Sequence, residues 1–290
     1  MNTESTLSQT VYICPLCNSP LNHQTTQNTY TCSNRHSFDC AKEGYINLLP
    51  VHHKHSKEPG DNKAMLTARR LFLEAGFYEP LARAIALMID TVQPLTPKAH
   101  ILDLGCGEGY YARKIIELCK RPEHIQLYGN DISKFAITAA AKKQKTAQFI
   151  VASSNKLPYA TDTFDIVYRV FAPSDATELF RLIKPAGYLL TVTPGPRHLW
   201  QLKEHIYTAV TEHTEDAEIP PGFTPITSQR VSYKISPDAA HREALLEMTP
   251  FAWSASEAIK DTLKRLTELD IEADFIVTLS VKSGHLNKMS

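Results

Sequence analysis

The sequence has no hydrophobic run long enough to cross a membrane. No apolar stretch in its 290 residues reaches the roughly 18 residues of a transmembrane helix. The polar first ten residues also lack the apolar segment of a secretory signal peptide. We therefore expect a cytoplasmic protein with no membrane partner.

A surplus of one charge is also missing. The 31 lysines and arginines equal the 31 aspartates and glutamates, so the overall charge does not indicate a nucleic-acid partner. One local basic cluster, with three histidines between positions 52 and 55, could contact phosphates: Lys54, Lys57, Lys63, Arg69 and Arg70. An ordinary solvated face is the alternative interpretation.

The six cysteines are too sparse and uneven for a disulfide framework, which fits a reducing compartment. Four lie in the first 40 residues, where Cys14-x2-Cys17 is followed after 14 residues by Cys32-x3-His36. Thiolates two residues apart can bind one tetrahedral zinc, and a second pair closes the site to water. We predict one structural Zn²⁺, which stabilises a segment too short to fold by hydrophobic burial. Cys40 is an alternative to His36, and a redox pair or free thiols are alternatives to a metal.

Residues 101–109, ILDLGCGEG, form an apolar strand that breaks into a loop with glycine at every second position. Glycine allows a tight turn and close backbone approach to a ligand, and the helical pattern that follows begins with unpaired N–H groups. Dinucleotide-binding loops read G-x-G-x-x-G, whereas here Asp103 stands two residues before Gly105, and Gly107 follows. The spacing resembles motif I of the class I S-adenosylmethionine-dependent methyltransferases, so we expect these residues to bind that cofactor.

Two further apolar runs end in polar residues that suit the same cofactor. The run 125–129 leads to Asp131, whose carboxylate can accept hydrogen bonds from both ribose hydroxyls. The run 147–152 leads to Ser153 and Ser154, which resemble the adenine-contacting loop of such methyltransferases. The alternative is that Asp103 and Asp131 only cap helices and the glycines only form a turn.

The remaining patterns complete the predicted fold. Helical periodicity is found in residues 62–75, 81–92, 237–247 and 256–269. Further strands are predicted at 164–167, 226–235 and 275–281. The prediction is an α/β fold, a Rossmann-like class I methyltransferase seven-stranded sheet with a small N-terminal zinc-ribbon domain. We expect a zinc-binding domain at 1–50, a linker and helical segment at 51–98, and the methyltransferase domain at 99–290.

Six strings carry a resemblance to a known family over nearly the whole chain: KEGYINLLP, PGDNKAMLTARRLFLEAGFYEPL, DLGCGEGYY, RVFAPS, TPGPRHLWQLK and MTPFAW. With the cysteine pairs, they resemble the RlmA family of 23S ribosomal RNA (guanine-N1)-methyltransferases. The resemblance implies a homodimer that binds S-adenosyl-L-methionine, methylates N1 of a guanine in a 23S rRNA hairpin, and uses its zinc domain for RNA recognition. It implies zinc ligation by Cys14, Cys17, Cys32 and His36. It also implies cofactor contacts by Tyr78, Gly107, Glu108 and His198.

The general base is harder to predict. Guanine N1 carries a proton in its neutral form, and a group within about 3 Å, or one water away, must accept it. The tips of the fourth and fifth strands offer Asp175 and His198, but Asp175 suits an N-cap and His198 a cofactor contact. We therefore assign no catalytic base. Phe171 and Trp200, beside the same tips, could stack on a splayed base or belong to the core.

Two other functions stay open: a small-molecule methyltransferase, and an RNA-binding or ribosome-assembly protein without turnover. The zinc ribbon argues against the first, because a small substrate has no use for it. The intact glycine loop with Asp131 argues against the second. Because the zinc segment and the glycine loop are separate in sequence, we also expect a chain starting near residue 60 to bind the cofactor.

Overall fold

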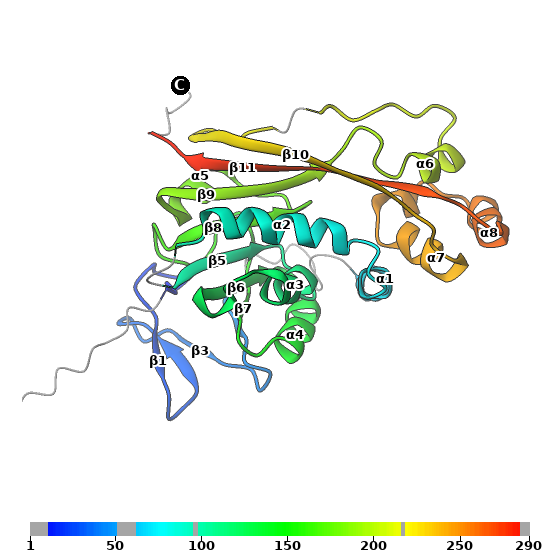
Figure 1. Cartoon of the computed structure of the whole chain (residues 1–290). Helices are drawn as coiled ribbons and strands as arrows, with labels where there is room; N and C mark the ends of the chain where they lie inside the picture. Colours follow the sequence, from blue (N-terminus) through cyan, green and yellow to red (C-terminus); the bar gives the residue numbers. More distant parts are fainter. Residues whose placement is uncertain (1–10, 51–61, 95–97, 216–217, 285–290) are drawn as a thin grey trace, which may run out of the picture.

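The computed structural model describes residues 11–50, 62–94, 98–215 and 218–284. Within these ranges, a central eight-stranded sheet has the order β10-β11-β9-β8-β5-β6-β7-β4 (Figure 1). The strands from β4 to β9 are parallel, and β10 and β11 add an antiparallel pair at one edge. The strands are β4 (Ile46–Asn47), β5 (Ala99–Leu104), β6 (Ile125–Asp131), β7 (Gln148–Val151), β8 (Phe164–Val170), β9 (Ile183–Pro194), β10 (Phe223–Ile235) and β11 (Ile271–Lys282).

Strands β5 to β11 confirm the predicted seven-stranded sheet. Strand β4 was not predicted, and it joins this sheet from the N-terminal segment by pairing with β7. The predicted domain boundaries stay predictions, although β4 belongs to the main sheet while lying in the range 1–50. The predicted linker at 51–61 lies outside the described residues.

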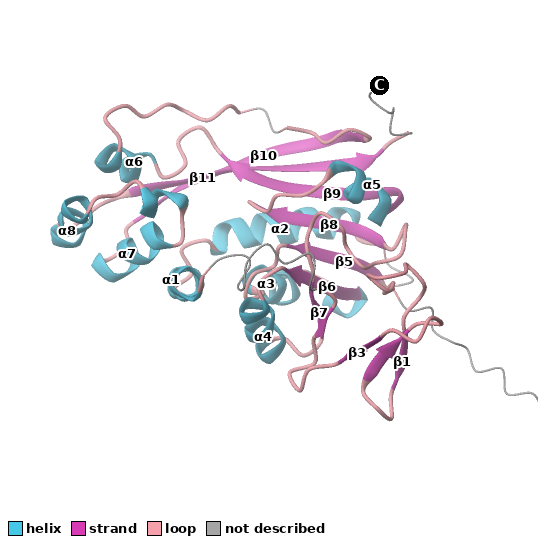
Figure 2. Ribbon diagram, turned by 180° about the vertical axis from the view of Figure 1, so that it is seen from behind, coloured by secondary structure: helices cyan, strands magenta, loops and turns pink. Residues whose placement is uncertain are grey.

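Helices cover both faces of the sheet (Figures 1 and 2). Helices α2, α3 and α4 pack on one face, and α5 packs with the N-terminal segment on the other. Because the central strand β5 is buried on both faces, Ile101 enters the first core and Leu102 the second. The helices are α1 (Lys63–Glu74), α2 (Glu79–Val92), α3 (Tyr110–Leu118), α4 (Lys134–Lys143), α5 (Ala176–Leu182), α6 (Trp200–Ile206), α7 (Ala239–Glu247) and α8 (Glu257–Arg265), with 3-10 turns η2 (Pro122–His124) and η3 (Pro250–Trp253).

The helices predicted from periodicity are all present, with ends set by capping side chains. Asn62 caps α1 by accepting the N–H of Met65, and Ser256 caps α8 by accepting the N–H of Ile259. Across the described ranges, no helix combines the length and apolar character that crossing a membrane requires.

The N-terminal segment consists of a small sheet that docks on the main one. Its strands are β1 (Asn22–Gln24), β2 (Thr29–Thr31) and β3 (Ser37–Asp39). The N–H of Ile13 donates to the carbonyl of Pro158 at 2.9 Å, and the N–H of Leu48 donates to that of Val151 at 3.0 Å. The segment therefore contacts the main sheet on both sides of residues 152–157.

Strands β10 and β11 extend beyond the rest of the sheet. From Phe275 to Val281, β11 pairs with both β9 and β10, but from Ile271 to Asp274 it pairs with β10 alone. Figures 1 and 2 show α6, α7 and α8 at the far end of this two-stranded arm, with α1 beside them. We call α1, α6, α7, η3 and α8 the roof. Its elements α1 and η3 line a cavity whose opposite wall is formed by the carboxyl ends of the parallel strands.

Candidate active site and metal centre

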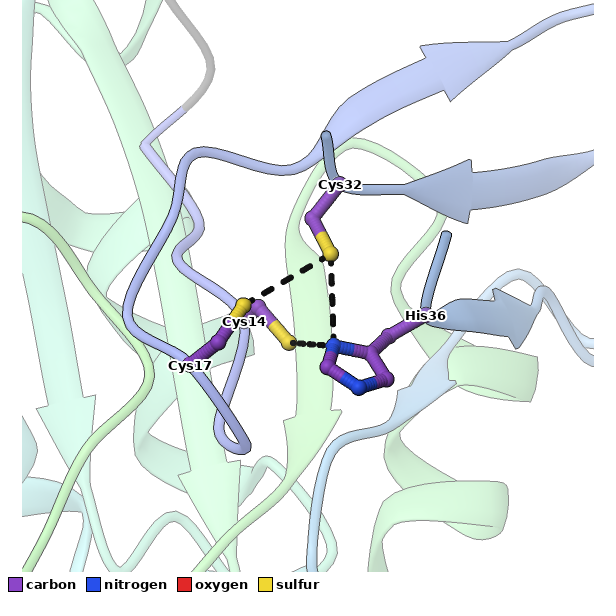
Figure 3. Close-up of side chains that lie close together, drawn as sticks. All are labelled: Cys14, Cys17, Cys32 and His36. Atoms are coloured by element: carbon purple, nitrogen blue, oxygen red, sulfur yellow. Dashed lines mark hydrogen bonds between the residues drawn. The ribbon is translucent and has the colours of Figure 1, made fainter. Parts of the chain in front are cut away.

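Four side chains in the N-terminal segment converge on one point (Figure 3). The ligand atoms of Cys14, Cys17, Cys32 and His36 all lie within 4.8 Å of one another. The Sγ atoms of Cys17 and Cys32 are 3.7 Å apart, and the Sγ atoms of Cys14 and Cys32 are each 3.4 Å from Nδ1 of His36. Ligands at about 2.3 Å (sulfur) and 2.0 Å (nitrogen) from a tetrahedral zinc are about 3.5 to 3.8 Å apart, so the cluster fits Zn²⁺.

Cys40 lies outside this group, which favours His36 over the alternative fourth ligand. The two thiols of the first pair have different surroundings. Hydrogen bonds from Ser19 lower the pKa of Cys17 to about 5, and burial raises that of Cys14 to about 11. Metal binding requires the thiolate form, so Cys17 is already suited to it.

A cavity of about 870 Å³ lies between the roof and the carboxyl ends of the parallel strands. Ligand-binding groups of this class of fold converge at that edge, and the volume suits a small-molecule cofactor. All nine residues expected to bind the cofactor lie in its wall: Tyr78, Asp103, Gly105, Gly107, Glu108, Asp131, Ser153, Ser154 and His198. The structure thus brings together residues that the sequence places on separate elements.

The glycine loop depends on its glycines. Gly105 and Gly107 have φ angles of +71° and +53°, which other residues rarely adopt. A Cβ on Gly105 would lie 2.6 Å from Cβ of Ala172, whereas a Cβ on Gly107 would have no neighbour within 4 Å. The N–H of Gly107 donates to Oδ2 of Asp131 at 3.0 Å, and the N–H of Ser133 donates to Oδ1 at 2.8 Å. Asp131 therefore fixes the position of the glycine loop beside the tip of β6.

Asp103 lies beneath this loop and is 2% exposed. Burial raises the pKa of its carboxyl to about 7, and the charge of Asp131 acts in the same direction. Among the described residues, its Oδ2 has no hydrogen-bond partner. A buried acceptor without a donor costs free energy, so this atom suits the ammonium group of an amino-acid tail. The capping alternative fails for both acids, because Gly109 and Ser133 are the N-caps of α3 and α4.

The predicted basic strip is not assembled as expected. The guanidinium of Arg70 forms a bidentate ion pair with Glu108, and Arg69 donates to the carbonyl of Met248 at 3.3 Å. Both arginines line the cavity, so they face the candidate cofactor site. Lys63 lies over the ring of Phe135 at 5.8 Å, and Lys54 and Lys57 fall outside the described residues.

Neither candidate base has the expected geometry. Asp175 caps α5 by accepting the N–H of Glu178 at 2.9 Å and does not line the cavity. His198 lines the cavity, but its Nδ1 accepts the N–H of Asp274 at 3.4 Å. Burial, reinforced by the charge of Lys203, lowers the pKa of His198 to about 3. The ring is therefore neutral, and its remaining nitrogen, Nε2, carries the proton and is a donor.

The two aromatic candidates differ. Phe171 lines the cavity, is 45% exposed and has a φ angle of +55°, an unfavourable backbone conformation for a bulky residue. Trp200 does not line the cavity, and its ring lies 4.5 Å from the guanidinium carbon of Arg197. A role in stacking on a base therefore fits Phe171 and not Trp200.

Sequence reasoning missed two residues of the site. His213 lines the cavity, and its Nε2 lies 2.8 Å from Nζ of the buried Lys203. His213 follows α6 in an irregular segment, where no periodicity or spacing marks it. The one signal in the neighbouring sequence was Lys203, because a lysine on the buried side of a short helix needs a polar partner.

Comparison with known proteins agrees with this arrangement. Residues 12–57 match the family model of the RlmA N-terminal zinc ribbon, and residues 95–242 match that of a methyltransferase domain. A Bacillus subtilis (strain 168) protein named as a candidate 23S rRNA (guanine-N(1)-)-methyltransferase, YxjB, is 30% identical over 96% of this chain and 99% of its own length. The 23S rRNA (guanine(748)-N(1))-methyltransferase of Streptomyces fradiae is 29% identical over 88% of this chain and 90% of its own. These matches confirm the predicted fold class and cofactors.

Proposed function

Because the chain belongs to the family of the 23S rRNA (guanine-N1)-methyltransferases, we propose that it methylates N1 of a guanine in a hairpin of 23S rRNA. The observation that carries the proposal is the cavity wall, where the glycine loop, Asp103 and Asp131 meet beneath the roof. The methyltransferase and zinc-ribbon matches on one chain favour this function over a small-molecule methyltransferase.

The residues present fit S-adenosylmethionine. Oδ2 of Asp103, which has no hydrogen-bond partner within the described ranges, would accept from the ammonium group of its methionine moiety, beside the open backbone at Gly107. Asp131 at the tip of β6 would accept from the ribose hydroxyls, and Ser153 and Ser154 would border the adenine. When bound there, the cofactor would supply an electrophilic methyl group for guanine N1 and would keep the electron pair of the broken carbon–sulfur bond as a thioether.

The chain's own task is to position the guanine and exclude water. The exposed ring of Phe171 lies in the cavity wall, where it can hold a base that has left its stack. Tyr78 is buried in the same wall, and burial raises its pKa, so its hydroxyl stays protonated and neutral. The Nε2–H of His198 is a donor for a ligand acceptor within the cavity.

The test is methyl transfer to 23S rRNA from cells that lack the protein. N1-methylguanine blocks the Watson–Crick edge, so reverse transcription should stop one position before the modified base. The stop should appear with the wild-type protein and be lost with Asp103→Ala. Transfer to small molecules without any stop in 23S rRNA would contradict the proposal.

Three finer points belong to the same proposal. The zinc domain assists RNA recognition, the chain works as a homodimer, and it acts in the cytoplasm, where 23S rRNA is made. Light scattering after size-exclusion chromatography tests the dimer, and fractionation tests the location. RNA binding that persists at unchanged affinity after zinc removal would contradict the role of the zinc domain.

A further inference from the structure

A buried lysine and a histidine meet at the cavity. Lys203 on α6 is 5% exposed, and its Nζ lies 2.8 Å from Nε2 of His213 and 5.6 Å from the ring centre of Phe251. Within the described residues, no carboxylate forms an ion pair with Lys203. Lysines are almost never buried without a counter-charge, so this pairing with an imidazole indicates a functional role.

His213 is held in place although it lies in an irregular segment. Its N–H donates to the carbonyl of Pro196 at 3.1 Å. On either side, Glu212 forms an ion pair with Arg197 at 3.7 Å, and Glu215 forms one with Arg230 at 3.2 Å. These contacts fix the segment against the tip of β9, and the His213 side chain forms part of the cavity wall.

Apart from Asp103, the other carboxylates and the other imidazole of the cavity wall are already engaged. Glu108 pairs with Arg70, and Glu74 pairs with Arg113 and Lys143. Asp131 accepts two backbone N–H groups, and Nδ1 of His198 accepts a third. Asp103 is buried beneath the glycine loop, on the side proposed for the cofactor. His213 is the remaining imidazole in the cavity wall among the described residues.

We propose that His213 accepts the N1 proton of guanine during methyl transfer and that Lys203 positions its ring from the opposite nitrogen. The inference rests on the proposed function. As the N1–methyl bond forms, the lone pair of Nδ1 takes the N1 proton, while Nε2–H donates to the neutral amine of Lys203. The pair then holds one extra proton, which it releases to water once the methylated base has left.

The electrostatics support this assignment. Burial lowers the pKa of Lys203, and burial with the charge of Lys203 lowers that of His213. Both shifts favour the neutral forms that a proton acceptor needs. Other charged or titratable groups on the surrounding elements are His198 and Arg197 before α6, Glu212 and Glu215 beside His213, and Arg69 of α1 on the cavity wall.

The experiment measures single-turnover methylation of 23S rRNA by His213→Gln between about pH 6 and about pH 9. The wild-type rate should rise with pH and level off when the pair is neutral. The variant should be about 100-fold slower at neutral pH, and its rate should rise roughly tenfold per pH unit without levelling off, because hydroxide replaces the lost base. Its S-adenosylmethionine affinity, measured by calorimetry, should equal that of the wild type.

Three further variants distinguish a proton acceptor from a structural residue. His205→Gln changes a histidine on α6 that does not line the cavity, and it should leave rate and pH profile unchanged. Lys203→Met should slow the reaction and move the midpoint of the rise to lower pH, because His213 then titrates alone and the rise no longer requires Lys203 to lose its proton. Lys203→Arg should not restore the wild-type rate, because a guanidinium has no acceptor atom for the Nε2–H of His213.

An unchanged rate in His213→Gln would overturn the inference, and so would a slower rate that keeps the wild-type pH profile. A wild-type protein that leaves 23S rRNA unmethylated would instead overturn the proposed function. The two failures are therefore distinguishable in one set of reactions.

Discussion

Loss of the zinc ion should weaken S-adenosylmethionine binding, because the N-terminal segment supports one wall of the cavity. Residues 152–155 line the cavity between two anchors, the hydrogen bonds from Leu48 to Val151 and from Ile13 to Pro158. Ile13 directly precedes the ligand Cys14, and the ring of Tyr12 packs 5.4 Å from that of Tyr159. Without zinc the cysteine pairs separate, and the anchors lose their support.

The magnitude follows from the cost of ordering this wall again. Fixing one residue's backbone costs about 1 to 2 kcal/mol, so fixing Ser153 and Ser154 costs about 2 to 4 kcal/mol. Since about 1.4 kcal/mol corresponds to tenfold in affinity, the zinc-free protein should bind S-adenosylmethionine about 30-fold more weakly, or worse.

Calorimetric titration of the wild type and of Cys17→Ser, with zinc content measured by mass spectrometry, tests this prediction. Cys40→Ser is the matched control, because Cys40 lies in the same segment but outside the four-residue cluster, and it should keep both zinc and affinity. Equal affinity in a zinc-free Cys17→Ser protein would refute the reasoning. The expectation that a chain starting near residue 60 binds the cofactor would then stand.

Three other substitutions test the site. Asp131→Ala should weaken S-adenosylmethionine binding by about 2 kcal/mol through lost hydrogen bonds to a charged acceptor, and unchanged affinity in calorimetry would remove Asp131 from the site. Asp103→Asn should raise the melting temperature of the cofactor-free protein more at about pH 8 than at about pH 5. Because the folded-state pKa of about 7 lies above the usual 3.8, ionisation of Asp103 lowers the stability of the fold as the pH rises from 3.8 to about 7. Equal shifts in melting temperature at both pH values would contradict this. Gly195→Ala should lower the free energy of unfolding by about 2 kcal/mol or more, because its Cβ would lie 2.5 Å from Cγ of the buried Asp274; an unchanged urea midpoint would show that the carboxylate has room to move.

The sheet and much of the cavity wall were predictable because their signals are local. Asp103, Gly105 and Gly107 follow one apolar strand, Asp131 follows the next, and parallel strands bring such tips to one edge. The cysteine spacing similarly identified the metal cluster. Spacing alone could not choose between His36 and Cys40, and the three-dimensional arrangement favours His36.

The rest depended on contacts between residues distant in the sequence. Strand β4 has two residues, too few for any periodic pattern, and it exists because β7 offers it an edge. Arg70 looked like a phosphate ligand because charge alone does not reveal a partner such as Glu108, 38 positions away. The proposed role of His213 depends on its contact with Lys203, which lies on a different element and could not be inferred from local sequence.

The arm formed by β10 and β11 also restricts how this chain can change in length. Along β11, Ala273 and Phe275 enter the core while Asp274, between them, binds Arg230. Because side chains alternate with a period of two, deletion of one residue here would move Phe275 to the face of Arg230 and bring the carboxylate of Asp274 into the apolar cluster. Viable insertions and deletions must therefore come two residues at a time and in both strands together. The length of the arm therefore sets the distance between the roof and the strand tips, in steps of about 7 Å for each pair of residues.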